Sequence, residues 1–164
     1  MIKIQLDDKK LAVKLGQIAR QLAQPSKLYG VLGETLKKIH KKRFEAETAP
    51  DGKKWRPLSP LTSQMKGNDN ILRRRGYLSD KTAYNYDSKG VEFGSDAKYA
   101  RLHQFGGTIK PKRAKRLKLG ESGVYAKQVT VPARPWLGIN DNDEAQLLKK
   151  SQQLLQRQID NHLR

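Results

Sequence analysis

Three stretches of the chain place apolar residues three or four positions apart, so that they share one face of a helix. The first predicted helix starts at Asp7 or Asp8 and ends before Pro25. The second is capped by Ser26, and the third covers residues 141–163. The three faces consist of Leu11, Leu15, Ile18 and Leu22; of Tyr29, Leu32, Leu36, Ile39 and Phe44; and of Leu147, Leu148, Leu154, Leu155, Ile159 and Leu163.

Other stretches alternate apolar and polar residues, which predicts short strands. Residues 2–6 form the first of them. Residues 82–86 and 91–94 form two more, and the turn formers at 87–90 between them predict a β-hairpin. Residues 129–131 are a further candidate. We therefore predict an α+β fold, in which helices pack on a small, mainly antiparallel β-sheet.

Two long loops interrupt the single domain that we predict over residues 1–164. The first, 49–76, is rich in Pro, Gly, Asn and Asp and lacks periodicity, and we expect Trp55 to pin it to the core. The second, 108–127, is strongly basic.

A short helix is predicted between the hairpin and the second loop. Ser95 or Asp96 can cap its start, and Gly106 with Gly107 ends it. The aromatic residues in and after this helix are interpreted as core. They are Tyr99, Phe105 and Trp136.

The net charge of the chain indicates which class of partner it binds. The 164 residues include 34 Lys and Arg against 16 Asp and Glu, which gives a net charge of +18. Such a charge attracts polyanions, above all nucleic acids. The chain has no Cys, which excludes a disulfide framework and a thiolate nucleophile. We see no signal peptide and no apolar run that could span a membrane, so we expect a cytoplasmic location.

The charge is concentrated between residues 110 and 118, where six of nine residues are cationic. The run contains no aromatic residue, so we expect contacts with the phosphates of DNA or RNA rather than base stacking. An acidic protein partner and a solvated loop with no single partner both stay open. The six cations are Lys110, Lys112, Arg113, Lys115, Arg116 and Lys118.

The search for catalytic motifs is mostly negative, because no nucleotide-binding, serine hydrolase or zinc protease pattern occurs. Asp51, Asp96 and Lys98 match the PD…D-x-K pattern of some metal-dependent nucleases. However, Asp51 lies in a turn-rich stretch and Asp96 can cap a helix, so we expect these simpler roles. His40, His103 and His162 are scattered in the sequence. We expect no metal, no cofactor and no enzymatic activity.

Four blocks occur in an order that resembles the phage virion morphogenesis family, which includes protein G of Mu-like phages and tail-completion protein S. The blocks are APDGKKWRPLSP at 49–60, ILR and GYL at 71–73 and 76–78, YARLHQFGG at 99–107, and VPARPWLG at 131–138. The resemblance implies that their most distinctive residues are fold and assembly elements. These are Trp55, Tyr99, His103, Phe105, Gly106, Gly107, Pro132, Arg134, Pro135 and Trp136.

The resemblance implies a non-enzymatic bacteriophage or prophage protein that completes the tail or joins it to the head. Such a protein assembles in the host cytoplasm and is a virion component, and related neck proteins form rings around the DNA channel. The implied partners are other tail or neck proteins, further copies of the chain and packaged DNA. A sixfold ring would carry about +108, with the loop at 108–127 in its lumen. A sequence-nonspecific nucleic-acid-binding module and the nuclease described above are the alternatives.

Overall fold

The computed structural model describes residues 9–22, 24–73, 76–120 and 123–162. The predicted strand at 2–6, the helix start at Asp7 or Asp8, and Leu163 lie outside these residues.

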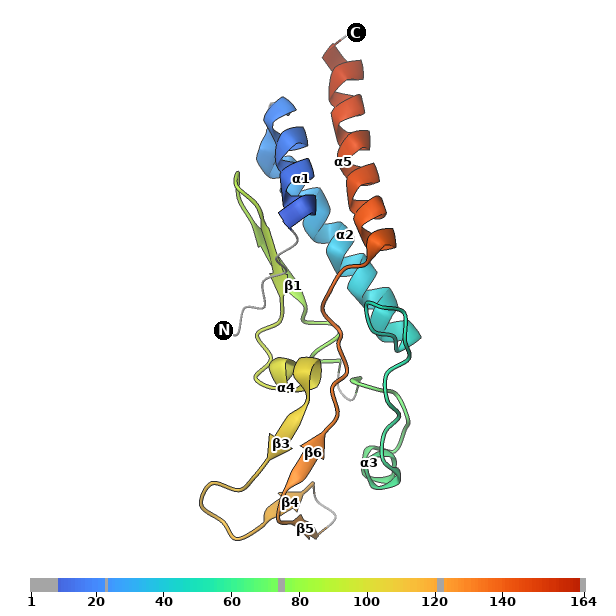
Figure 1. Ribbon diagram of the computed structural model, residues 1–164, viewed down its shortest axis with the longest axis vertical. Coiled ribbons are helices and arrows are strands. Elements are labelled where there is room, and N and C mark those ends of the chain that lie inside the picture. The colour runs from blue at the N-terminus through green and yellow to red at the C-terminus, as the bar shows by residue number, and fades with distance from the viewer. Residues whose placement is uncertain (1–8, 23, 74–75, 121–122, 163–164) are drawn as a thin grey trace.

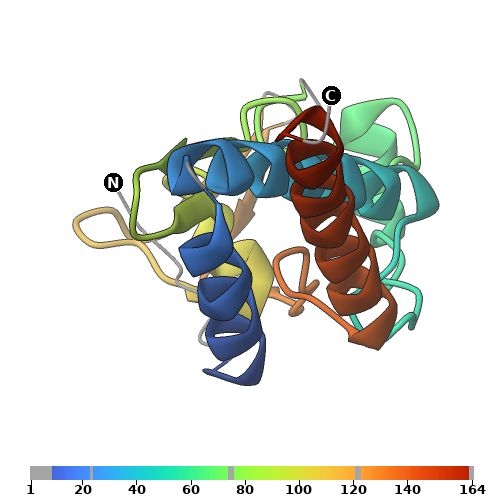
Figure 2. The same cartoon turned by 90° about the horizontal axis from the view of Figure 1, so that it is seen from above.

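Three long helices form one end of the elongated molecule (Figure 1). They are α1 (Lys9–Gln21), α2 (Pro25–Ala46) and α5 (Asp141–His162). The last helix packs against both of the others, as the view from above shows (Figure 2). A hydrophobic cluster joins the three, in which Leu28, Leu32 and Leu147 are almost fully buried. The helical periodicity therefore identifies most of the core faces, but the prediction is wrong for Ile159 of α5, which is 45% exposed.

The helix starts are set by backbone chemistry. α2 begins at Pro25, whose missing N–H is no loss in a first turn, and the preceding Gln24 makes no side-chain cap. The predicted cap at Ser26 is therefore wrong. At the start of α5, Asn140 Oδ1 accepts from the backbone N–H of Asp143 at 2.9 Å, and Asp143 Oδ2 accepts from that of Asn140 at 3.1 Å. This reciprocal pair satisfies two N–H groups that the helix itself leaves free.

The predicted hairpin is present and lies against α2. β1 (Ala83–Tyr86) pairs antiparallel with β2 (Val91–Gly94). In the turn between them, Asp87 Oδ1 accepts from the backbone N–H groups of Lys89 and Gly90. The hairpin approaches the helix closely at Gly33, where an added Cβ would lie 2.1 Å from the ring of Tyr84. A glycine is therefore required there by space.

Substitution of this glycine gives a first prediction. Gly33→Ala is expected to lower the free energy of unfolding by about 1–3 kcal/mol, because the Tyr84 ring or the helix must move. The matched control is Gly16→Ala in α1, where nothing lies within 4 Å of the new Cβ. That change is expected to raise stability by about 0.5–1 kcal/mol through helix propensity. Urea unfolding of both variants measures the difference, and equal effects would contradict the packing described.

A second hydrophobic cluster lies at the C-terminal end of α2 and contains Phe44, Trp55 and Trp136. Because Phe44 belongs to α2, this helix connects both clusters. The ring of Phe44 stacks on Trp136, with centroids 5.9 Å apart, and meets Trp55 edge-on at 5.5 Å. Trp55 is only 3% exposed, so it pins the stretch after α2 to the core.

His40 of α2 is fully buried beside this cluster. Its Nδ1 lies 2.7 Å from the carbonyl oxygen of Leu36, and its Nε2 lies 3.4 Å from the backbone nitrogen of Gly138. The ring packs on Phe93 at a centroid distance of 4.4 Å. Burial, assisted by the nearby Arg43 charge, lowers the pKa of His40 to about 4 although its backbone hydrogen bonds oppose the shift.

The lowered pKa predicts that the fold weakens in mild acid. The unfolded chain, with a His pKa near 6.5, binds a proton more readily than the folded chain, so stability rises with pH in this window. The contribution of His40 is present above pH 6.5 and is lost as the pH falls to about 4. The loss is expected to be about 3 kcal/mol. Unfolding measured across this range checks it, and a His40→Gln variant with the same acid sensitivity would contradict the assignment.

The two stretches predicted as loops contain regular elements. α3 (Pro60–Lys66) lies within 49–76, where Ser59 Oγ accepts from the backbone N–H of Thr62 and caps it. Strands occupy parts of 108–127, so the expectation of one long loop there is wrong. They are β3 (Gly107–Ile109), β4 (Leu117–Leu119) and β5 (Val124–Ala126), and the predicted strand at 129–131 is β6 (Val129–Val131).

The α+β class is confirmed, but the described strands form three separate two-stranded antiparallel ribbons rather than one sheet. The short helix after the hairpin is α4 (Ala100–Phe105). Its start has no side-chain cap, and Ser95 Oγ instead accepts from the backbone N–H of Ala97 at 3.2 Å. The predicted cap at Ser95 or Asp96 is therefore wrong.

Candidate interaction site: a basic arm and the junction that holds it

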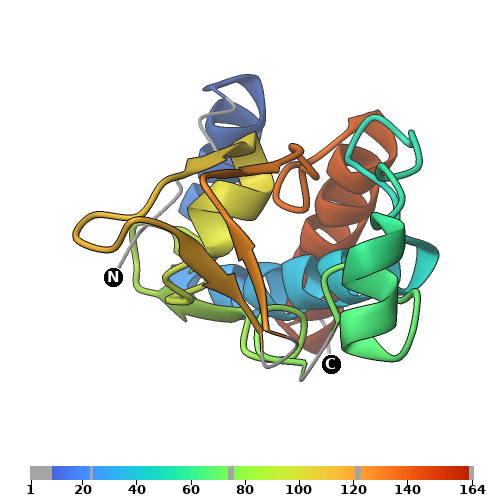
Figure 3. The same ribbon diagram turned by 90° about the horizontal axis from the view of Figure 1, so that it is seen from below.

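Residues 107–131 form an arm at the end of the molecule opposite the long helices (Figures 1 and 3). At its base β3 pairs with β6, and at its tip β4 pairs with β5, both antiparallel. The segment 110–116 between β3 and β4 projects beyond the rest of the molecule. No described residue of the arm is buried. The arm therefore has no hydrophobic core of its own.

All six cations of the 110–118 run are exposed, and so is Lys127. Within the part of the chain that the structure describes, none of the seven forms an ion pair. The strand register places Lys118 opposite Tyr125, whose side chain is 55% exposed. The sequence search missed this aromatic neighbour, because Tyr125 is separated from the basic run in the chain and meets it only through strand pairing.

The arm leaves the body at Gly106, which has a left-handed φ of 70°. An added Cβ there would lie 2.7 Å from the backbone nitrogen of Ala133 and 3.0 Å from the carbonyl oxygen of Val131. Only glycine fits both the conformation and the close approach. Gly107 follows as the first residue of β3, opposite Val131. The two glycines therefore set the direction of the arm.

Gln104 of α4 ties the returning chain to the body. Its Oε1 accepts from the backbone N–H groups of Trp136 and Leu137, both at 2.9 Å, and its Nε2 donates to the carbonyl of Leu137 at 2.9 Å. One side chain thus satisfies three backbone groups. Gln104 lies inside the YARLHQFGG block, but nothing in the residue pattern alone assigns it this role.

Arg134 connects the same segment to the stretch after α2. Its Nε donates to the carbonyl of Arg56 at 2.7 Å, and an Nη donates to that of Pro57 at 2.9 Å. The indole N–H of Trp55 donates to the carbonyl of Pro135 at 2.7 Å, so the two segments hold each other from both sides. Arg134 is only 5% exposed, which makes it a structural cation rather than a surface one.

A buried ion pair joins this junction to the helices. An Nη of Arg43 donates to Asp143 Oδ2 at 2.7 Å, and its other Nη donates to the carbonyl of Gly138 at 2.6 Å. Both side chains are almost fully buried. Burial lowers the pKa of Arg43, and the carboxylate of Asp143 opposes this shift. The end of α2, the start of α5 and the segment before it are thereby locked together.

The aromatic residues of the family blocks divide into two groups. Trp136 is fully buried, and its indole N–H donates to the carbonyl of Ala100 at 3.2 Å. Tyr99 and Phe105, in contrast, are 40% and 62% exposed, so their interpretation as core is wrong. Tyr99 packs edge-on against His103, whose Nδ1 is buried without a hydrogen-bond partner among the described residues. Pro132, at the end of β6, is half-buried.

The structure shows where the three residues of the nuclease pattern lie. Asp51 is exposed and serves a turn, accepting from the backbone N–H of Lys53 at 3.1 Å, and hydrogen bonds from Lys53 lower its pKa. Asp96 and Lys98 are exposed. Across the described ranges, no group of three His, Cys, Asp or Glu residues is placed to hold a metal ion. The side chain of His162 lies outside the described residues.

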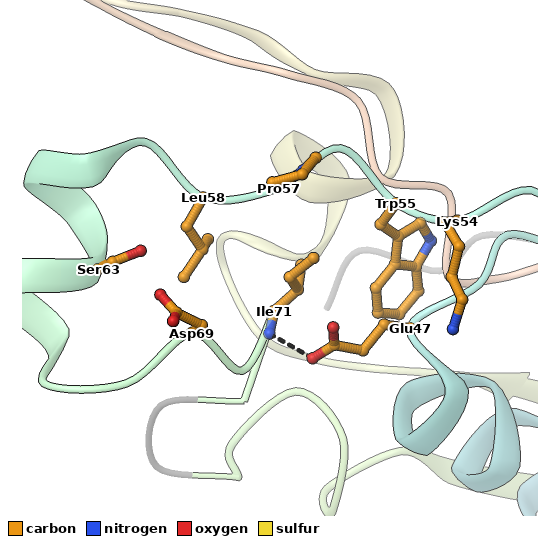
Figure 4. Close-up of a pocket in the computed structure, with 8 residues that line it drawn as sticks. All are labelled: Glu47, Lys54, Trp55, Pro57, Leu58, Ser63, Asp69 and Ile71. Atoms are coloured by element: carbon orange, nitrogen blue, oxygen red, sulfur yellow. Dashed lines mark hydrogen bonds between the residues drawn. The ribbon is translucent and has the colours of Figure 1, made fainter.

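A pocket of about 380 Å³ lies beside α3 (Figure 4). Glu47 Oε1 accepts from the backbone N–H of Ile71 at 2.7 Å, which anchors the returning loop to the end of α2. Trp55 and Leu58 give the pocket apolar walls, and the carboxylate of Asp69 lies at its far side. Its residues are Glu47, Lys54, Trp55, Pro57, Leu58, Ser63, Asp69 and Ile71. The first family block therefore builds this face of the body.

A model of the phage virion morphogenesis family matches residues 6–156, which include the arm, its junction and most of α5. The chain belongs to this family. No curated protein and no solved structure gives a significant match. Membership assigns the chain to the assembly of phage virions. Among the described residues, no helix is long and apolar enough to cross a membrane.

Proposed function

We propose that this protein is a non-enzymatic structural component that completes the phage tail or joins it to the head. It acts as a closed ring of copies around the DNA channel, with the arm of each copy directed toward the DNA. Assembly takes place in the cytoplasm of the host bacterium, among other tail and neck proteins. Family membership supports the assembly role, and the arm supports the contact with DNA.

The observation that carries this proposal is the exposed charge of the arm. Six cations between residues 110 and 118 and Lys127 point into solvent without a described carboxylate partner. They sit on a support that the family blocks build through Gly106, Gln104 and Arg134. Cations that reach phosphates bind the DNA backbone without reading its sequence. A channel protein needs such a contact, because any sequence must pass.

The oligomeric state of the purified chain tests the ring directly. We expect the purified chain, mixed with a short DNA duplex, to elute as a discrete oligomer in size exclusion with light scattering, and to show a central hole in negative stain. A protein that binds DNA as one chain per site under all salt conditions would instead indicate a sequence-nonspecific binding module. The two outcomes separate the proposed function from its alternative.

Contact with phosphates predicts a steep dependence of DNA affinity on salt. If all six cations of the run meet phosphates, the slope of log affinity against log salt concentration is expected to be roughly −5. Replacement of the six with Gln should remove most of this slope. A binding titration at several salt concentrations measures it.

A control variant with the same loss of positive charge tests whether the arm itself binds DNA. Six exposed lysines of the helices are replaced with Gln in the control, and this variant should keep the steep slope. They are Lys27, Lys37, Lys38, Lys41, Lys42 and Lys149. Equal losses in both variants would show that total charge, not the arm, binds DNA.

A further inference from the structure

One exposed aromatic side chain lies among the cations of the arm. The strand register places Tyr125 of β5 directly opposite Lys118 of β4. Directly opposite residues of an antiparallel pair point to the same face of the ribbon, with Cβ atoms about 5 Å apart. Tyr125 is 55% exposed, and Lys118 is exposed as well. The β4–β5 ribbon therefore presents an aromatic ring and a cation side by side to the solvent.

The ring of Tyr125 differs in its surroundings from the other exposed tyrosines of the chain. Each of the other three already contacts a neighbouring ring or ammonium group. The pairs are Tyr77 with Lys81, Tyr86 with Tyr84, and Tyr99 with His103. Within the described ranges, the side chain of Tyr125 makes no ring pair, no cation contact and no hydrogen bond. None of the described side chains therefore occupies the faces of this ring.

A ring beside a cation matches the two parts of a nucleotide. Base faces stack on aromatic side chains whatever the base, and phosphates pair with lysine and arginine. Proteins that bind single strands combine these two contacts. Here Tyr125 supplies the ring, and Lys118 with the exposed cations of the 110–116 segment supplies the charge. The basic run alone contains no aromatic residue, so it is the strand pairing that adds stacking to the phosphate contacts.

The stacking contact selects a form of DNA that charge alone does not select. Along a duplex, each base is covered above and below by its neighbours, so no base face is open to a side chain. Unstacked bases of single strands do offer a face to aromatic side chains. The last base pair of a duplex offers one as well, because it has a neighbour on one side only.

We propose that Tyr125 stacks on an open base face of the DNA, at a single-stranded stretch or at a duplex end, while Lys118 and the cations of the run hold the adjoining phosphates. This inference rests on the proposed function, from which it takes the contact between the arm and DNA. Stacking tolerates every base, so the contact stays independent of sequence. The arm then holds DNA with open bases more firmly than the continuous duplex that passes through the channel.

Three DNAs separate stacking from charge in a filter-binding titration with the full-length chain. They are a single strand, a blunt-ended duplex and a small closed duplex circle, which has neither ends nor unpaired bases. We expect Tyr125→Leu to lower the affinity for the single strand by about five- to a hundredfold, because one stacked base is lost. The affinity for the circle should change by less than about twofold, because the phosphate contacts are kept.

The blunt-ended duplex shows which source supplies the base. A loss of affinity for it that matches the loss for the single strand would support stacking at a duplex end. A loss confined to the single strand would support stacking on unpaired bases. Equal losses for all three DNAs would indicate a contact with the DNA backbone and would overturn the proposal.

Two control variants leave the net charge of the chain unchanged, as Tyr125→Leu does. Tyr125→Phe keeps the ring and should keep most of the affinity for the single strand. Phe105→Leu removes a ring that is 62% exposed but belongs to α4, outside the arm, and its affinity should equal that of the unchanged chain. A loss in Tyr125→Phe as large as that in Tyr125→Leu would assign the contact to the hydroxyl group and overturn stacking.

A photochemical cross-link locates the contact in the chain. A single strand that contains 5-iododeoxyuridine is bound and irradiated, and the cross-linked peptides are identified by mass spectrometry. We expect the main cross-link at Tyr125, and its disappearance in Tyr125→Leu. Cross-links at other residues with none at Tyr125 would overturn the proposal.

The outcome is separable from that of the proposed function. If the unchanged chain binds all three DNAs with a steep salt dependence and Tyr125→Leu binds each of them equally well, stacking is overturned and the phosphate contact stands. If the unchanged chain binds none of the three, the contact between the arm and DNA in the proposed function is itself overturned.

Discussion

Trp136→Ala is expected to lower the free energy of unfolding by about 4 kcal/mol. The indole is fully buried, stacks on Phe44 and donates to the carbonyl of Ala100. The substitution leaves a large cavity at the point where the arm junction meets α2. It also removes the hydrogen bond from the indole N–H to α4. Denaturant unfolding followed by circular dichroism measures the loss.

The control for this variant is Phe105→Ala, which removes a comparable aromatic side chain that is 62% exposed. Its effect on stability is expected to stay within about 0.5 kcal/mol. The two residues come from neighbouring family blocks, so the pair separates a fold role from a surface role. A stability loss at Phe105 as large as that at Trp136 would contradict the burial described.

Asp143→Asn is expected to cost about 3–5 kcal/mol, because it leaves the buried charge of Arg43 without a counter-charge. The amide oxygen can still accept from the backbone N–H of Asn140, so the helix cap is kept and the charge alone is tested. The double variant Arg43→Met with Asp143→Asn should lose less than the single variant, because no buried charge is left unpaired. Denaturant unfolding of the unchanged chain and of both variants measures the two losses.

The exposed pair of Asp51 and Lys53 is the control for this prediction. Asp51→Asn breaks an ion pair of 3.1 Å in which both side chains are exposed to solvent, so we expect little change in the free energy of unfolding. A loss at Asp51 equal to that at Asp143 would contradict the burial of the Arg43 pair.

The helices and the hairpin could be predicted because their signals are local. The apolar residues of α2 from Tyr29 to Ile39 are spaced three or four positions apart in the chain. The turn at Asp87 forms within four consecutive residues. Such patterns depend only on residues that are close together in the chain. α3 could not be predicted from the sequence, because its cap Ser59 and its first residue Pro60 lie among many turn formers. Ser and Pro are typical of turns and of helix starts alike.

The junction and the β4–β5 ribbon could not be predicted, because they depend on contacts between residues that are not neighbours in the chain. Arg43 follows five lysines of α2 and looks like one more solvent-facing cation, yet it pairs with Asp143 a hundred residues later. A weak signal exists, since Arg43 lies four positions after the buried Ile39 and shares its face. Strands β4 and β5 have three residues each, and β4 begins inside the basic run at 110–118. Only their pairing makes them strands.

The candidate site was therefore predicted in part. The six cations were found from sequence because a charge run is visible without a fold. Tyr125, which lies opposite Lys118 in the β4–β5 ribbon, was not found, because the two residues meet only through strand pairing. Of the family residues, Trp136 and Arg134 hold the junction, whereas Tyr99 and Phe105 stay exposed on the surface.

The central claim is that the basic arm serves virion assembly, and particle counts test it most directly. A phage lacking this gene is complemented with the unchanged chain, with the chain lacking residues 110–118, or with the six-lysine helix control. Tailed, DNA-filled particles are then counted by electron microscopy. We predict that the unchanged chain and the helix control restore them, and that the chain without the run yields particles that are unjoined or have lost DNA. Unchanged particle yield and DNA retention without residues 110–118 would contradict the account.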